Sequence, residues 1–99
     1  MNAVLDIEAK AEAREAALFY EACRPGLGQD FTRAVEDALK QIEERPRLWR
    51  RFKGRFRRFI LRRFPYALVY TIERDCLYVV AVMHAKRKPD YWLTRVREL

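Results

Sequence analysis

The last third of the sequence brings together side chains that can move protons and hold phosphates. The only histidine, His84, directly follows the most apolar run of the chain, "CLYVVAVM" at residues 76–83. Its imidazole can titrate near neutral pH, the guanidinium of Arg87 can hold a phosphate through two hydrogen bonds, and the phenol of Tyr91 can stack on a base or pass a proton. This stretch could therefore serve acid–base chemistry on a phosphodiester, or it could be a docking surface for an acidic partner.

Each of these side chains also has a plain structural interpretation. His84 stands at the end of a predicted strand, where its ring could hydrogen-bond to the neighbouring backbone. Trp92 could pack on a sheet instead of stacking on a base, and Trp49 could fill a gap between helix and sheet or form part of a docking surface. The residue types alone leave these alternatives open.

The charge of the chain is divided between its two halves. Residues 1–44 carry five Lys/Arg and ten Asp/Glu, a net charge of −5, whereas residues 45–99 carry sixteen and four, a net charge of +12. In the segment 45–63, ten of nineteen residues are basic and none is acidic. This concentration of positive charge must be balanced by phosphate, by an acidic protein or by counterions. Arg57 and Arg58 are adjacent in a predicted strand, so one of them should face away from any helices packed on the sheet.

Size and composition predict one small domain over residues 1–99. The start of the chain has no basic stretch followed by an apolar core, and the longest apolar run, eight residues, is far below the roughly 20 that span a membrane. Cys23 and Cys76 are too few for a disulfide framework or a zinc site. We expect a cytoplasmic protein with reduced thiols, no metal, no cofactor and no membrane partner.

Hydrophobic periodicity predicts two helices followed by three strands. The clearest helix carries Phe31, Val35, Ala38, Leu39 and Ile42 on one stripe and ends before Pro46. The predicted architecture is α+β, with the order β-α-α-β-β-β-α: an antiparallel sheet with an N-terminal helical hairpin packed on one face. The expected elements are strands at 3–7, 55–63, 65–73 and 76–84, helices at 8–23 and from 24–28 to 45, and a short helix from Pro89 that aligns Trp92, Val96 and Leu99.

The last two strands are apolar on both faces. Regular alternation places Val80, Val82 and His84 on one face of strand 76–84, and Leu77, Val79, Ala81 and Met83 on the other. A helical hairpin covers one face only. The second face must be covered by the C-terminal segment, by a second copy or by a partner.

The order of these elements, together with the segments "PGLGQDF", "RRFPYALVY" and "VVAVMHAKRKPDYWLTR", resembles the RelE/ParE superfamily of bacterial toxins. These are the toxic halves of type II toxin–antitoxin modules, and the resemblance covers nearly the whole chain. It implies one of two activities. RelE-like members cut mRNA in the ribosome, whereas ParE-like members share the fold, poison DNA gyrase and are not nucleases.

The nuclease residues of the superfamily are only partly matched. Arg87 matches the arginine at the end of the last strand, but Ala67 stands where RelE-like nucleases carry an arginine. Their basic pair on the preceding strand is met by Arg58 alone, with Ile60 at the second position, and Tyr91 falls about two residues short of their C-terminal tyrosine. We therefore favour the ParE-like branch. The RelE-like nuclease remains the alternative, with His84, Arg87 and Tyr91 as candidate catalytic residues.

The resemblance also implies a cognate antitoxin, which the basic half-chain predicts to be acidic, partly apolar and partly disordered when free. The target would be DNA gyrase, or the ribosome and its mRNA in the alternative. Whether the chain forms a homodimer or only a complex with other proteins stays open. The residues predicted to bind the antitoxin or a nucleic acid are Arg55, Arg57, Arg58, Arg62, Arg63, Lys86, Arg87 and Trp92.

Overall fold

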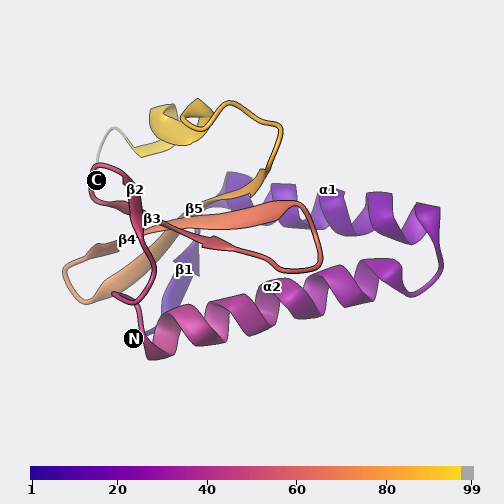
Figure 1. Ribbon diagram of the computed structural model, residues 1–99, viewed down its shortest axis with the longest axis horizontal. Helices are drawn as coiled ribbons and strands as arrows, with labels where there is room; N and C mark the ends of the chain where they lie inside the picture. Colours follow the sequence, from indigo (N-terminus) through magenta and orange to yellow (C-terminus); the bar gives the residue numbers. More distant parts are fainter. Residues whose placement is uncertain (97–99) are drawn as a thin grey trace.

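Two helices pack on one face of a five-stranded sheet, and a short C-terminal segment lies on the other face (Figure 1). The computed structural model describes residues 1–96. The elements are β1 (Ala3–Leu5), α1 (Ile7–Cys23), α2 (Leu27–Glu44), β2 (Arg51–Lys53), β3 (Phe56–Ile60), β4 (Tyr66–Glu73), β5 (Cys76–His84) and the 3₁₀ helix η1 (Tyr91–Val96).

The strand order is β1-β5-β4-β3-β2, and every neighbouring pair is antiparallel except β1 and β5, which run parallel. The predicted α+β fold with a helical hairpin on one face is confirmed. Strand 76–84 was predicted with its observed ends, but the predicted strand 55–63 is shorter. Strand β2 was missed, and it joins β3 through a turn at Gly54, whose φ of 53° is in the left-handed region.

The two helices form a tight hairpin. The predicted stripe of α2 is confirmed, with Phe31 and Ile42 fully buried. At the tip, the carboxylate of Glu21 accepts hydrogen bonds from the backbone N–H groups of Gly26 and Gly28 and so caps the start of α2. A Cβ on Gly28 would lie 2.5 Å from the carbonyl oxygen of Ala17, so only glycine allows the helices to approach this closely. Within residues 1–96, no helix is both long and apolar enough to cross a membrane.

Strand β5 contains a bulge that the regular alternation did not predict. Val69 pairs with Ala81, and the next residue of β4, Tyr70, pairs with Val79, which leaves Val80 as an extra residue. The side chains therefore change faces along the strand. Val79 packs with Val82 in the helix-side core, whereas Val80 packs with Ala81 on the opposite face. The predicted sharing of one face by Val80 and Val82 is wrong for this reason.

The C-terminal segment covers the second face of the sheet. Trp92 is fully buried, and its ring lies 4.7 Å from the ring of Phe56. Val80 packs with Trp92 and is fully buried, and Val82 is buried in the helix-side core. Of the three kinds of cover left open by the sequence, the C-terminal segment is therefore the one observed. The predicted final helix is a 3₁₀ helix that begins at Tyr91, and the predicted contribution of Leu99 lies outside the described residues. What the fold leaves to partners is therefore the rim of the sheet, not its apolar faces.

Candidate functional site

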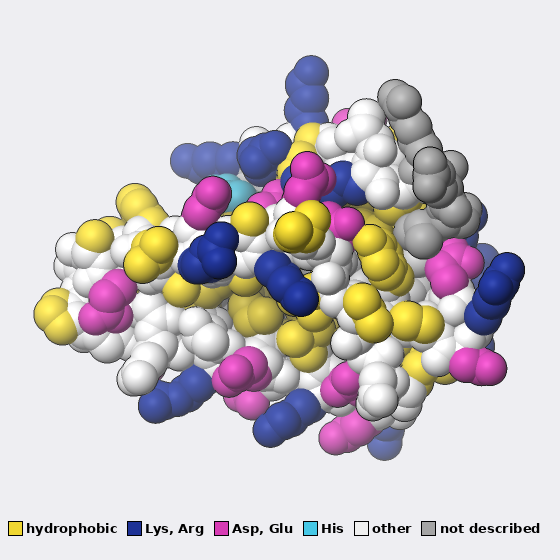
Figure 2. Space-filling view, turned by 180° about the vertical axis from the view of Figure 1, so that it is seen from behind, with side chains coloured by type: hydrophobic (Ala, Val, Ile, Leu, Met, Phe, Trp, Pro, Cys, Tyr) yellow, Lys and Arg dark blue, Asp and Glu magenta, His cyan; other side chains and the backbone are white. Residues whose placement is uncertain are grey.

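The cations predicted for partner binding divide into those with carboxylate partners and those without. Arg55 lies 2.7 Å from Glu73, and Arg63 lies 3.1 Å from Asp30, in ion pairs that remain partly exposed. Arg62, Lys86 and Arg87 are exposed, and no carboxylate within residues 1–96 forms an ion pair with any of the three. Figure 2 shows Lys and Arg side chains projecting from the molecule beside the single histidine.

Arg57 and Arg58 point to opposite faces of the sheet, as predicted from their adjacent positions. Arg57 donates to the backbone carbonyls of Arg47 and Trp49, at 3.2 and 2.8 Å, and so holds the loop that precedes β2. Arg58 lies on the other face, with its guanidinium carbon 4.6 Å from the centre of the Phe52 ring. Trp49 fills a gap at the edge of the helix-side core, where its ring lies 4.7 Å from the ring of Phe59.

Four of the predicted cations line one groove. Arg58, Arg62, Arg63 and Arg87 surround a cavity of about 490 Å³ on the face of β3, β4 and β5 that η1 also occupies. Ala67 lines the same groove, at the position where an arginine would complete a phosphate-binding set. Trp92, also predicted for this surface, is fully buried. Its ring packs on the face beside the groove and is not exposed to a partner in the described structure.

His84 has the plain structural role that the sequence left open. Its Nδ1 accepts a hydrogen bond from the backbone N–H of Lys86 at 3.0 Å, and its ring packs edge-on against Tyr66, with the ring centres 4.9 Å apart. The imidazole lines a small cavity of about 190 Å³ between α1 and β5, which Glu15 and Arg87 also line.

The sheet separates this histidine from the cationic groove. His84 pairs with Tyr66 across β4 and β5, and Tyr66 packs on the helix side of the sheet. Arg58 and Met83 belong to the opposite face, where the groove lies. Tyr66 and Arg87 line both cavities, and Arg87 is the candidate catalytic residue of the two. A phosphate bound next to Arg58 would have the sheet between it and the imidazole.

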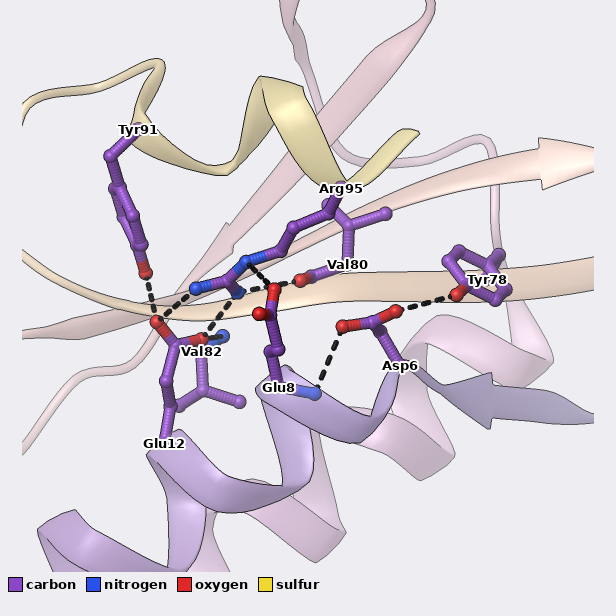
Figure 3. A network of polar contacts seen from close by, with 8 residues as sticks. All are labelled: Asp6, Glu8, Glu12, Tyr78, Val80, Val82, Tyr91 and Arg95. Atoms are coloured by element: carbon purple, nitrogen blue, oxygen red, sulfur yellow. Dashed lines mark hydrogen bonds and ion pairs between the residues drawn. The ribbon is translucent and has the colours of Figure 1, made fainter. Parts of the chain in front are cut away.

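The hydroxyl of Tyr91 is hydrogen-bonded within the protein. Its hydroxyl donates to Glu12 at 2.5 Å (Figure 3). The guanidinium carbon of Arg87 lies 3.8 Å from the centre of the Tyr91 ring. Burial raises the pKa of Tyr91, and the hydrogen bond to Glu12 and the negative charge of Glu12 raise it further. The phenol therefore stays protonated near neutral pH and directs its proton to a carboxylate of the protein itself.

Glu12 is the centre of a network that ties α1, β5 and η1 together (Figure 3). One carboxylate oxygen accepts from the backbone N–H of Val82 at 3.0 Å and from Arg95 at 2.9 Å, and the other accepts from Tyr91 and again from Arg95. Arg95 also donates to the carbonyl of Val80 and forms an ion pair with Glu8. Sequence reasoning missed this network, although the spacing of Glu8 and Glu12 places both on one side of α1.

Neither a metal site nor a disulfide is found within residues 1–96. Within residues 1–96, no group of three His, Cys, Asp or Glu side chains is arranged to hold a metal ion. Cys23 and Cys76 are both free thiols.

A family model described as ParE toxin of the type II toxin–antitoxin system parDE matches residues 4–89. The chain belongs to the ParE toxin family. A solved structure titled as a chromosomal ParDE toxin–antitoxin system from P. aeruginosa shares its fold, with a TM-score of 0.66 and 13% sequence identity over 87% of this chain and 97% of that chain. No curated protein matches the sequence. The family match ends before η1, so the Glu12 network with Tyr91 and Arg95 involves residues outside it.

We expect Glu12→Gln to lower the free energy of unfolding by about 2–3 kcal/mol, because it leaves the nearly buried guanidinium of Arg95 without its carboxylate. Chemical denaturation followed by circular dichroism measures this change. Glu15→Gln, one turn further along α1 and exposed, is the control and should change stability by less than about 0.5 kcal/mol. Equal effects of the two substitutions would show that the network does not hold the C-terminal segment.

Proposed function

We propose that this ParE-family toxin inhibits bacterial growth by binding DNA gyrase and that a cognate antitoxin neutralises it. The observation that carries the proposal is the family match over residues 4–89. Binding requires a stable, charged surface and no catalytic group, and the cationic rim of the sheet provides such a surface.

The geometry supports binding more than catalysis. Ala67 and Ile60 line the groove at positions where a nuclease would need cations to stabilise charge that develops on phosphate. His84 lies on the other face of the sheet, and the proton of Tyr91 is held by Glu12. A general base, a general acid and a phosphate clamp do not meet at one point.

A ribosome-dependent endoribonuclease is the second candidate function. It is favoured by one observation, the presence of Arg58, Arg62 and Arg87 in a single groove, which could hold a phosphate of mRNA. In that function Arg87 would bind phosphate, and His84 would act from the neighbouring cavity that Arg87 also lines.

The substitution His84→Ala separates the two functions. Under gyrase binding, the folded variant should stop bacterial growth as strongly as the parent chain does, because the imidazole contributes only local packing and one hydrogen bond. Growth after induction is the measurement, with soluble folded protein verified by circular dichroism. A folded variant that has lost its toxicity would favour the nuclease, for which loss of a general acid or base costs about 10²–10⁴-fold in rate.

The antitoxin surface follows from the uncompensated charge. Arg62, Lys86 and Arg87 are exposed, and Arg58 lines the groove together with Arg62 and Arg87. An acidic segment that is disordered when free could neutralise these cations as it folds onto the rim of the sheet. Such a segment would also block whichever target the toxin binds.

Reversing the charge of Arg62, Lys86 and Arg87 to Glu should slow association with the cognate antitoxin by about tenfold or more at low salt, and should weaken the salt dependence of the rate. Stopped-flow or surface-based kinetics at several salt concentrations measures both effects. The matched control reverses three exposed cations of the helices, Lys10, Arg14 and Lys40. If the rim variant is folded and associates as fast as the helix variant, the antitoxin binds elsewhere.

A further inference from the structure

Strand β3 has a stretch of outer edge that no strand covers. Its outer neighbour β2 pairs through only two positions, Arg51 with Arg57 and Lys53 with Phe56. One more backbone hydrogen bond follows, from the N–H of Arg58 to the carbonyl of Arg50 at 3.2 Å. Beyond that bond the described chain places no strand next to β3 on this side.

The direction of the backbone groups at Ile60 follows from its neighbours. The N–H of Leu61 donates to the carbonyl of Tyr66, toward β4, at 2.9 Å, whereas the N–H of Arg58 points outward to Arg50. In an antiparallel ladder the backbone groups of successive residues point alternately to the two neighbouring strands. The N–H and C=O of Ile60 therefore point outward, to the side where no strand lies.

The surroundings of Ile60 have room for an added chain. Its side chain is 62% exposed, although it lies in a strand of the sheet. It lines the cationic groove of about 490 Å³, a second groove of about 550 Å³ between β3 and α2, and a third of about 380 Å³ beside Trp49 and Phe52. An extended segment next to Ile60 would direct alternate side chains into grooves on the two faces of the sheet.

The charge around this edge selects an acidic segment. Arg50 and Arg58 line the groove on one side of Ile60, and Arg62 lines the grooves on the other. Within residues 1–96, neither Arg50 nor Arg62 forms an ion pair with a carboxylate. Carboxylates on the added chain would meet these cations.

The edge of β5 beyond β1 and the outer edge of β2 are protected. Beyond β1, the outer edge of β5 is closed by the backbone N–H of Asp6, which donates to Val79, and by the side chains of Glu12 and Arg95, which bond to Val82 and Val80. Strand β2 is three residues long, contains a register shift and carries charged side chains, features that discourage pairing. The uncovered stretch at Ile60 is different, because its exposed side chain is apolar.

We propose that the antitoxin adds an extended, acidic segment to the sheet as a strand beside β3, with main-chain hydrogen bonds to the N–H and C=O of Ile60. The inference rests on the proposed neutralisation by an antitoxin and specifies how that partner binds. Main-chain pairing supplies affinity, while apolar cover of Ile60 and contacts to Arg50 and Arg62 supply specificity.

Amide hydrogen exchange measured by NMR on the toxin, free and in complex with its co-purified antitoxin, tests the proposal. The N–H of Ile60 should exchange at least about tenfold more slowly in the complex. The N–H of Arg58 is the internal control, since its bond to Arg50 already exists in the free chain. If the complex forms and Ile60 exchanges as it does in the free chain, the edge proposal is overturned while neutralisation stands. If no complex forms, neutralisation itself fails, and the edge proposal fails with it.

A second copy of this chain would give a different pattern. Protection of the Ile60 amide in the free protein that disappears on dilution would assign the edge to self-association and would overturn the proposal.

Two variants separate main-chain pairing from side-chain contact. Ile60→Pro removes the outward N–H, at a position where an edge strand tolerates proline, and Ile60→Ala removes most of the side chain but keeps the N–H. We expect the proline variant to bind the antitoxin about tenfold or more weakly than the alanine variant in calorimetry. Equal affinities of two folded variants would contradict strand addition. If the proline variant does not fold, the exchange measurement on the parent chain decides.

Discussion

The arrangement of the second face of the sheet depends on the carboxylate of Glu12. This carboxylate lies at the edge of β5 and joins α1, β5 and η1. It accepts hydrogen bonds from the backbone of Val82, from Tyr91 and from Arg95. Strand β1 pairs with β5 only from Leu77 to Val79, and beyond it the side chains of Glu12 and Arg95 bond to the backbone of Val82 and Val80. The same bonds hold η1 over the sheet, where Trp92 completes the second core.

This arrangement determines what remains for partners. The acidic residues of the N-terminal half are partly used inside the molecule, where Glu12 neutralises Arg95 and Asp30 neutralises Arg63. Within residues 1–96, Arg62, Lys86 and Arg87 on the rim of the sheet form no ion pair with a carboxylate. We therefore propose that partners bind at that rim, and the hydroxyl of Tyr91 already donates to Glu12.

The sequence allowed much of the fold to be predicted, because α2 has a strong periodic pattern, because residues 76–83 form a continuous apolar run, and because the resemblance covered nearly the whole chain. The bulge could not be predicted, since residues 76–83 are apolar throughout and alternation carries no signal in such a run. Glu12 and Arg95 are 83 positions apart in the sequence, so their ion pair could not be predicted from the position of either residue. The adjacency of Arg57 and Arg58 correctly predicted opposite faces, because that inference needs only regular strand geometry.

We propose that this toxin acts by binding gyrase and not by catalysis. The most direct measurement adds the purified protein, in parallel, to a supercoiling reaction of DNA gyrase and to translating ribosomes with a defined mRNA. If the toxin binds gyrase, we expect a concentration-dependent loss of supercoiling and an intact mRNA. Cleavage of the mRNA with unchanged supercoiling would contradict it.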